Sequence, residues 1–491
     1  MTAVRLLLPQ GGLRRWHCAL AERLAAKRHR ALIETRERRG APPPSTALIE
    51  ALEDLIARPR PPATLDRAPA GAWSAPGAGD ADLVFDLTGS AEPEPGAIVP
   101  LYDGAAGEAA RDAALLDGRA PWIELAQMTG DALRVYASAL PAVRRRDLLS
   151  SGRAAVVDAL AALVVQLAGR GLGETALLCV AAPPPAPAPL RFAAATLAGL
   201  IERRLRRLVV RDGHWRVGVR RRAPGEAPFA GLDRLDNGGW RWLSDDRRRY
   251  FADPFVFEEG GAAYVFCEEY SYATGKGVIS VCALDDEGNP GPPRVVLERP
   301  YHLSYPFVFR HDGAIWMIPE SGANRTLELY RADPFPFRWT LDRVLLSGIE
   351  IADATPFPRN GDWWLAATGG ELEGASWDSL SFYCGASPLG PWTPAFDGPA
   401  LIDASAARPA GRVFEHEGAL WRPAQDCRVG YGSGLALCRI DALAPGAFRQ
   451  TPMQRFAPPG GLHTFNMTDR FAVIDAAGPR ARASWLRGFG G

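Results

Sequence analysis

The chain contains almost no lysine, and its charges balance. Lys27 and Lys276 are the only lysines among 491 residues, and the 56 basic residues match the 56 acidic ones. Arginine therefore carries nearly all of the positive charge. Because the net charge is zero, the chain as a whole has no general attraction to nucleic acid or acidic lipid. We therefore expect no nucleic-acid partner.

Cysteine is also sparse and shows no pairing pattern. The seven cysteines are odd in number, and no two of them stand in a CxxC motif. This excludes a regular disulfide framework and argues against a zinc site, so we expect free thiols and no bound metal. The seven are Cys18, Cys179, Cys267, Cys282, Cys384, Cys427 and Cys438.

Long apolar segments are missing from the sequence. The apolar stretch at the N-terminus is too short for a signal peptide, and no uninterrupted apolar run reaches about 18 residues. We therefore expect a cytoplasmic protein without a transmembrane segment.

The second half of the chain contains a repeated phrase. The first copy reads Asp-Pro-Phe-Val-Phe from Asp253 and is followed by a glycine after eight residues and by Glu268 after fifteen. The second copy begins at Tyr305, repeats both spacings without a gap and ends at Glu320. Each copy is an apolar strand, a glycine turn and a second apolar strand, which predicts a β-hairpin.

Two further copies extend the series. The third begins at Thr355 and reaches its glycine, Gly361, two residues early, so that Thr368 falls in the last place by the shortened count. The fourth begins at Ala410 and ends at Gln425. Starts about 50 residues apart are typical of β-propeller blades, in which hairpins stack around an axis to bury their apolar faces.

The ends of this region predict how the ring closes. If the segments 215–242 and 462–475 pair, they form one more blade, and the propeller has five. Closure of this kind removes exposed sheet edges.

The first half has a different pattern. A short apolar strand from Val4 to Leu8, a Gly11-Gly12 turn and an amphipathic helix from Trp16 to Arg28 are typical of an α/β domain. From about residue 150 the pattern becomes helical. We therefore predict a Rossmann-like α/β domain over 1–135, a helical connector over 136–214 and an all-β five-bladed propeller over 215–491.

Carboxyl groups recur at the same end of the blade phrases, which predicts that they face one funnel at the axis. Cleavage of a glycosidic bond needs one carboxyl to protonate the leaving oxygen and a second group to activate water or an acceptor hydroxyl. We expect Asp253 to be the base and Glu320 or Asp353 to be the acid. The expected substrate-binding residues are Glu268, His302, Tyr305, Arg408, Arg412, Gln425, Asp426 and His463.

A purely structural interpretation of these residues is also open. Asp253 could cap its strand, the glutamates could bind backbone amides between blades, and Arg408 or Arg412 could pair with a neighbouring carboxylate. A histidine such as His302 or His463 is often a packed side chain.

The propeller motifs resemble known families. The phrase Ala252-Asp253-Pro254-Phe255 and its repeat look like the five-bladed propellers of the glycoside hydrolase clan that includes arabinofuranosidases and xylosidases. That resemblance implies that Asp253 is the general base. Tyr305 and Thr355 stand where those hydrolases would carry an acidic pKa modulator and the acid.

A closer resemblance is to the N-terminal propeller domain of glucosamine inositolphosphorylceramide transferases and their bacterial relatives. It covers about residues 215–480 and rests on five motifs in order: His302 to Phe309, Met317 to Ser321, Glu328 to Ala332, Arg422 to Cys427 and Tyr431-Gly432. In those transferases the transferase activity is attributed to a separate domain, so the resemblance implies the propeller fold rather than that activity.

Residues 1–135 are faintly similar to the Rossmann-like domain of formyltransferases that use formyl-tetrahydrofolate. The strand-turn-helix opening, Asp86 to Gly89 and Leu101 to Gly104 carry this likeness, but the catalytic Asn and the His-Pro-Ser-Leu-Leu-Pro phrase of those enzymes are absent. We therefore expect the fold without formyl transfer.

These observations favour a carbohydrate-active protein that transfers or hydrolyses a glycosyl unit in surface-polysaccharide or glycolipid assembly. Its partner would be a glycan, nucleotide-sugar or glycolipid substrate, and no cofactor is expected. A non-catalytic glycan-binding propeller is the main alternative, and a sugar formyltransferase is a third possibility.

Overall fold

The computed structural model describes residues 2–40, 46–56, 63–68, 79–129, 132–173, 176–177, 189–236, 239–369 and 377–481. The chain divides into two compact units. The first contains residues 1–202, 372–375 and 397–403, and the second contains residues 203–371, 376–396 and 404–491. Each unit has its own hydrophobic core, so the two are described separately.

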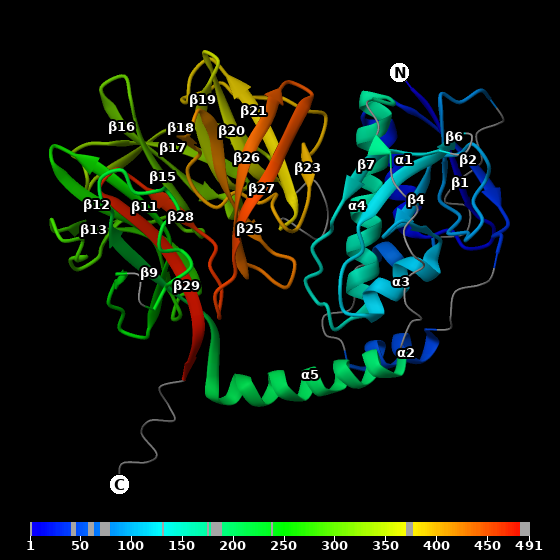
Figure 1. The fold of residues 1–491 in the computed structure, drawn as a ribbon, viewed down its shortest axis with the longest axis horizontal. Coiled ribbons are helices and arrows are strands. Elements are labelled where there is room, and N and C mark those ends of the chain that lie inside the picture. Colours follow the sequence, from blue (N-terminus) through cyan, green and yellow to red (C-terminus); the bar gives the residue numbers. More distant parts are fainter. Residues whose placement is uncertain are drawn as a thin grey trace, which may run out of the picture. The chain divides into compact units, whose positions relative to one another are not determined.

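The first unit begins with a small parallel sheet. Its strand order is β2 (Arg30–Arg36), β1 (Ala3–Pro9), β3 (Leu83–Asp86), and the helix α1 (Arg15–Ala26) connects β1 to β2 (Figure 1). The start of α1 is capped because the N–H of Arg14 donates to Nδ1 of His17 at 2.9 Å. Three parallel strands with a crossover helix establish an α/β unit, whereas the Rossmann-like and formyltransferase-like assignments stay predictions.

A second sheet of the first unit is antiparallel. Its order is β5 (Ala105–Ala106), β4 (Val99–Tyr102), β6 (Ile123–Thr129), β7 (Ala132–Ala139), β8 (Ala176–Leu177). The helix α3 (Glu108–Leu116) follows β5, and α2 (Ala47–Ile56) precedes β3. A single parallel bridge between Phe85 and Ile98 connects the two sheets.

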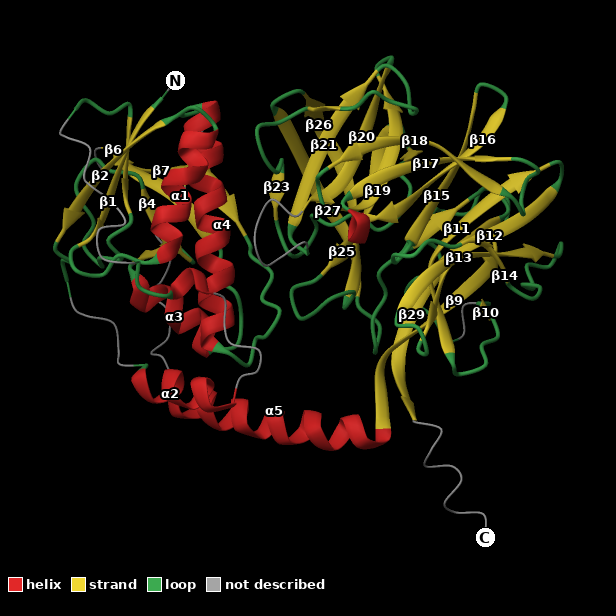
Figure 2. Cartoon of the chain, turned by 180° about the vertical axis from the view of Figure 1, so that it is seen from behind, coloured by secondary structure: helices red, strands yellow, loops and turns green. Residues whose placement is uncertain are grey.

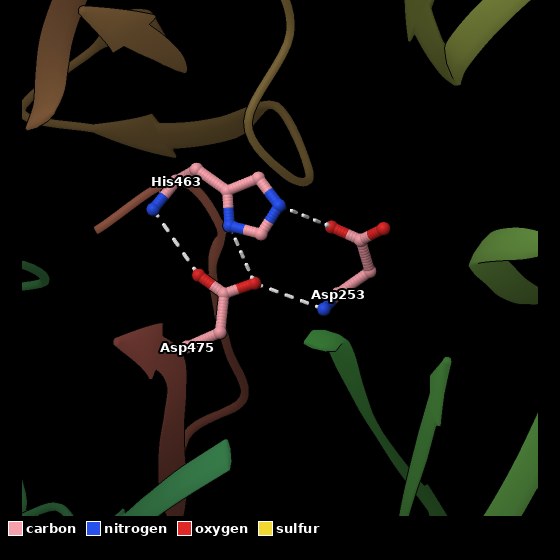
Figure 3. Close-up of side chains that lie close together, drawn as sticks. All are labelled: Asp253, His463 and Asp475. Atoms are coloured by element: carbon pink, nitrogen blue, oxygen red, sulfur yellow. Dashed lines mark hydrogen bonds and ion pairs between the residues drawn. The ribbon is translucent and has the colours of Figure 1, made fainter. Parts of the chain in front are cut away.

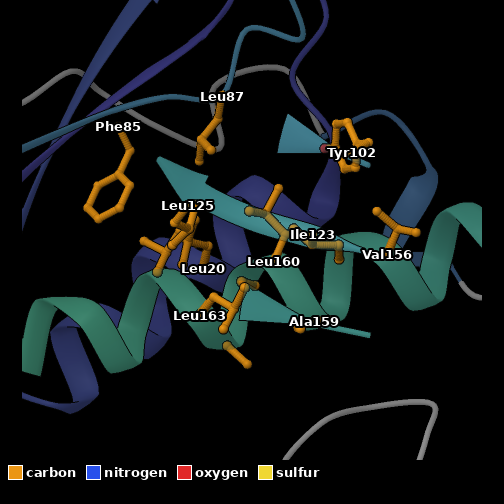
Figure 4. Packing of buried hydrophobic residues seen from close by; sticks show 14 of the residues in the cluster. Leu20, Phe85, Leu87, Tyr102, Ile123, Leu125, Val156, Ala159, Leu160 and Leu163 are labelled. Carbon is orange, nitrogen blue, oxygen red and sulfur yellow. The ribbon is translucent and has the colours of Figure 1, made fainter. Parts of the chain in front are cut away.

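The long helix α4 (Leu149–Arg170) lies in the core of the first unit. Its Val156, Leu160 and Leu163 pack in one cluster with Leu20 of α1 and Ile123 of β6 (Figure 4). The sequence placed this helix in a connector over 136–214, and the structure instead makes it part of the core. Within the described residues, α4 alone is long and apolar enough to cross a membrane, and 72% of its apolar window is buried in the unit.

The second unit is a ring of antiparallel sheets (Figure 2). The first blade contains β11 (Arg249–Glu259), β12 (Ala262–Ser271), β13 (Lys276–Leu284) and β14 (Arg294–Leu297). The second contains β15 (Ser304–His311), β16 (Ala314–Ser321), β17 (Thr326–Ala332) and β18 (Trp339–Ser347). The third contains β19 (Ile351–Arg359), β20 (Asp362–Gly369), β21 (Ser379–Gly385) and β22 (Thr393–Pro394). The fourth contains β24 (Phe414–His416), β25 (Ala419–Asp426), β26 (Gly434–Ala444) and β27 (Ala447–Phe456).

The closing blade combines both ends of the propeller region. Its order is β10 (Arg241–Trp242), β9 (Val210–Arg221), β29 (Phe471–Ala481), β28 (Phe465–Met467), and β9 pairs with β29 over most of its length. The predicted pairing of 215–242 with 462–475, and with it the five-bladed ring, is therefore confirmed. The helix α5 (Pro189–Val209) precedes β9, and the short strand β23 (Leu401–Ile402) belongs to the segment 397–403 of the first unit.

Candidate functional site

The inner strands of three blades carry the same β-bulge. The pairing register shifts between Ala252 and Phe255 in β11, between Ser304 and Phe307 in β15, and between Ala352 and Thr355 in β19. The first bulged residue of each strand has a left-handed backbone, with φ of 50° at Asp253, 45° at Tyr305 and 54° at Asp353. Non-glycine residues rarely adopt this conformation, and such strain is concentrated at functional sites.

The bulges correct the alignment of the third phrase. The residue equivalent to Asp253 and Tyr305 is Asp353 rather than Thr355, which is instead equivalent to the core residues Phe255 and Phe307. Counted from Asp353, the glycine at 361 and Thr368 fall at the usual spacing. The third blade therefore has a carboxyl at the position where the sequence analysis read threonine.

Asp253 lies at one end of a buried chain of polar contacts (Figure 3). The ring of His463 stands between two carboxyls, with Nε2 3.4 Å from Oδ1 of Asp253 and Nδ1 2.8 Å from Oδ2 of Asp475. Asp475 also accepts the backbone N–H of Asp253 at 2.9 Å, and Thr464 donates its hydroxyl to Oδ1 of Asp253 at 2.7 Å. Oδ2 of Asp253 accepts no hydrogen bond from the residues that the structure describes.

The pKa values of Asp253 and His463 are both raised. Burial raises the pKa of Asp253 to about 6, with His463 opposing the shift and Asp475 adding to it. Burial alone would lower the pKa of His463, but the carboxylates of Asp475 and Asp253 raise it. The imidazole is thus favoured in its charged form beside a carboxyl that titrates near neutral pH.

Glu268 adds a second buried carboxyl. Burial, followed by the charges of Asp253 and Glu320, raises its pKa well above the usual range. Its Oε1 has no hydrogen-bond partner among the described residues, and Nε2 of His302 lies 3.4 Å away. Nδ1 of His302 accepts the N–H of Gly277 at 2.9 Å, and a Cβ at Gly277 would lie 2.7 Å from that Oε1. Because Gly277 has no side chain, His302 and the carboxyl of Glu268 can lie close together.

Glu320 and Asp353 come from neighbouring blades. Oε2 of Glu320 accepts the backbone N–H of Asp353 at 3.3 Å, and Nε of Arg408 donates to Oδ2 of Asp353 at 2.5 Å. Loss of hydration raises the pKa of Glu320 to about 8, and the charges of Asp353 and Asp253 contribute to this shift. The charge of Asp253 thus influences Glu320, and the common funnel of the two carboxyls stays a prediction.

Tyr305 and Arg412 form a separate layer. The hydroxyl of Tyr305 lies 2.8 Å from Oγ1 of Thr355, and the guanidinium of Arg412 stacks 4.4 Å from the ring centre of Phe307. Nη2 of Arg412 donates to the carbonyl of Val308 at 2.7 Å. Among the described residues no carboxylate pairs with Arg412, and loss of hydration lowers its pKa to about 10.

The two fourth-blade candidates have different surroundings. Nε2 of Gln425 lies 3.4 Å from Oδ2 of Asp353, so Gln425 contacts one of the buried carboxyls described above. Asp426 instead pairs with Arg428 at 2.6 Å and Arg455 at 3.2 Å. Two arginines of its own blade thus hold Asp426, and its role in substrate binding stays a prediction.

Three residues of the site were missed by sequence reasoning. Asp475 and Thr464 hold Asp253 and His463 in place, and Tyr431 packs its ring 5.4 Å from that of His463 and 5.0 Å from the guanidinium of Arg408. An acidic residue inside the apolar strand β29 was a signal for Asp475. No comparable signal marks Thr464.

Three residues of the site could hold a metal ion. One ligand atom each from Asp253, His463 and Asp475 lies within 4.8 Å of the others. The three side chains are buried and are linked by the contacts described above.

The fold and the site define a class of protein: a five-bladed β-propeller whose axis holds a cluster of buried carboxyls with perturbed pKa values. Residues 244–458 match the family described as glucosamine inositolphosphorylceramide transferase 1, N-terminal. This match, which covers less than half of the chain, confirms the predicted resemblance. His463, Thr464 and Asp475 lie beyond the matched residues.

Two curated relatives show the same resemblance. The glucosamine inositolphosphorylceramide transferase 1 of Oryza sativa subsp. japonica is 35% identical over 208 residues, which cover 42% of this chain and 28% of the relative. The protein of the same name from Arabidopsis thaliana is 31% identical over 282 residues, covering 52% and 36%. The chain thus spans about a third of the length of these relatives.

Solved structures with a similar fold were also found. The RS223 β-xylosidase has a TM-score of 0.33 at 15% identity, covering 42% of this chain and 74% of the xylosidase. An exo-β-1,3-galactanase from Clostridium thermocellum has a TM-score of 0.36 at 11% identity, covering 52% and 62%.

Proposed function

We propose that the propeller carries the active site of a carbohydrate-active enzyme that transfers or hydrolyses a glycosyl unit, with Asp253 as general base and Glu320 as general acid. The matching relatives are named glucosamine inositolphosphorylceramide transferase 1, which supports a glycan or glycolipid substrate. Assembly of a surface polysaccharide or glycolipid in the cytoplasm is part of this proposal.

The proposed reaction has a simple proton balance. Oδ2 of Asp253 takes the proton from a water or acceptor hydroxyl while the oxygen of that group forms a bond to the anomeric carbon. The bond from the anomeric carbon to the leaving oxygen breaks, and Glu320 gives its proton to that oxygen. Asp253 ends protonated and Glu320 ionised, and exchange with solvent restores both groups.

One observation carries the assignment of roles: the environments of the two carboxyls separate their pKa values. Near neutral pH a group with a pKa of about 6 is mostly ionised, and a group with a pKa of about 8 is mostly protonated. At the same pH, Asp253 can therefore accept a proton and Glu320 can donate one. We assign the acid to Glu320 rather than Asp353 because the carboxylate of Asp353 already pairs with the guanidinium of Arg408.

Aromatic side chains next to the cluster support a sugar ligand. Tyr431 keeps about two fifths of its surface exposed, and its ring lies 5.5 Å from that of Trp377 and 5.4 Å from that of His463. The ring of Trp215 lies 4.0 Å from that of His463. An exposed ring beside hydrogen-bonding groups can stack on the apolar face of a sugar.

The Asp253→Asn variant tests the role of the base. The amide keeps the shape of the side chain and cannot accept the proton, so turnover should fall by at least about a hundredfold while glycan affinity changes less than about threefold. Turnover is measured with a panel of aryl glycosides and with nucleotide sugars plus glycolipid acceptors, and affinity by calorimetry with the substrate found in that panel.

Asp441→Asn is the matched control, because Asp441 pairs with Arg439 and Thr451 in the outer strands of the fourth blade. It should retain full turnover. If Asp253→Asn binds and turns over as the unchanged protein does, Asp253 is not the base. Glycan binding without any turnover in the unchanged protein would instead support the non-catalytic propeller.

A further inference from the structure

The helix α5 exposes an apolar face. Leu190, Leu197, Ile201 and Leu205 are spaced by seven, four and four residues, which places them on one side of a helix. Their exposed fractions are 77%, 48%, 54% and 60%. Single exposed apolar side chains are common, but four in line on one helix indicate an interaction surface.

The opposite side of the same helix is anchored. Phe192 packs in the core cluster of the first unit, and the hydroxyl of Thr196 donates to the carbonyl of Asp147 at 2.9 Å. These residues lie about 180° around the helix from the exposed stripe at 100° per residue. The anchoring therefore leaves the apolar face outward.

The charges of α5 have one dominant sign. Its sequence contains arginine at 191, 203, 204, 206 and 207 and a single acidic residue, Glu202. Arg191 and Arg204 are exposed and flank the apolar stripe on its two sides. The helix is thus locally basic although the whole chain has no net charge.

We propose that α5 lies in the surface of an anionic membrane, with Leu190, Leu197, Ile201 and Leu205 among the acyl chains and the flanking Arg191 and Arg204 at the lipid phosphates. A helix with an apolar stripe and a basic polar face is the type that binds in the plane of the interface. Anionic lipid complements the arginines. A second copy of the helix would instead bring arginines of like charge together along the stripe.

Vesicle flotation tests this proposal with the full chain. Vesicles of phosphatidylcholine with roughly a third of phosphatidylglycerol should capture at least about tenfold more protein than vesicles of phosphatidylcholine alone. Raising the salt concentration should weaken the capture, because salt screens exposed charges.

Two variants separate the apolar and the charged contributions. Leu197→Glu combined with Ile201→Glu should abolish capture, and Arg191→Gln combined with Arg204→Gln should reduce it several-fold while leaving the apolar stripe unchanged. The control is Leu341→Glu combined with Val344→Glu, which makes the same change at two exposed aliphatic residues of β18 and should bind as the unchanged protein does.

Three results would overturn the proposal. The first is the absence of capture by the anionic vesicles. The second is an equal loss in the β18 control. The third is a concentration-dependent dimer in light scattering that the Leu197→Glu and Ile201→Glu variant breaks, because the stripe would then bind a second copy. None of these results depends on glycosyl chemistry, so the test is separate from that of Asp253.

Discussion

At the scale of single residues, the described residues at the propeller axis include more buried carboxyl groups than cationic side chains that can pair with them. Asp253, Glu268 and Glu320 all have raised pKa values because burial and neighbouring carboxyls disfavour their charge. Among the described residues Arg408 pairs with Asp353, and His463 stands between Asp253 and Asp475. This imbalance is a cost in stability that the fold tolerates at a site where proton transfer requires it.

A stability measurement can detect this cost without a substrate. The pKa of Glu320 is about 8 in the folded chain and near 4.5 when unfolded, so between these values the folded state holds a proton that the unfolded state has lost. The contribution of Glu320 to stability is therefore full at low pH and is lost as the pH rises through about 8.

The neutral variant Glu320→Gln should reproduce the protonated state. We expect a modest increase in the melting temperature at about pH 6, where the unfolded state has already lost the proton, and a larger increase of several degrees at about pH 9, measured by scanning fluorimetry. The control Glu417→Gln alters a glutamate whose side chain is 82% exposed and should have no effect at either pH. An equal effect of Glu320→Gln at both values would contradict the raised pKa.

At the scale of elements, the blades meet through close backbone contacts. The N–H of Phe465 in β28 donates to the carbonyl of Ala410 at 2.8 Å, which connects the closing blade to the fourth blade. Gly411 follows with φ of 137°, and a Cβ there would lie 1.9 Å from the carbonyl oxygen of Phe465. Because that oxygen belongs to the backbone, it cannot move away as a flexible side chain would.

Gly411→Ala should therefore destabilise the propeller by about 3 kcal/mol or more. The unfolding transition in denaturant should move to markedly lower concentration or disappear. Gly478→Ala is the matched control in β29, where no atom lies within 4 Å of the added carbon. If the two variants have similar stability, the backbone at this contact can move far enough to accept the added carbon, which contradicts the prediction.

At the scale of the whole molecule, the closing blade determines whether the ring exists. The strand β29 pairs with both β9 and β28, so it connects the two ends of the propeller region, and it also carries Asp475. Without it β9 and β28 present unpaired edges, and the Asp253 and His463 backbones lose their shared acceptor.

Deletion of residues 471–491 should therefore prevent the propeller from folding cooperatively. Limited proteolysis should degrade residues 215–470 rapidly, and the near-ultraviolet circular dichroism of the tryptophans should be lost. Deletion of residues 482–491 alone is the control and should preserve both signals. Resistance to protease in the longer deletion would show that four blades are stable on their own.

The local pattern of the sequence by itself determined the hairpin repeats, the pairing of the two ends and the position of Asp253, because strand alternation, glycine turns and spacing are local properties of the chain. The placement of α4 in the core of the first unit did not follow from that pattern, since a buried helix and a connecting helix can share the same apolar composition.

Only the tertiary structure decided which residues meet at the axis. The sequence Thr-Pro-Phe from Thr355 resembles the start of the repeated phrase. The bulge in β19 shows instead that Asp353 is the residue equivalent to Asp253. The early position of Gly361 is a sign of this alignment. The register of a strand, however, depends on its pairing with the next strand rather than on the similarity of its local sequence. Likewise, Asp475 and Asp253 are 222 residues apart, and only ring closure brings them into hydrogen-bond contact.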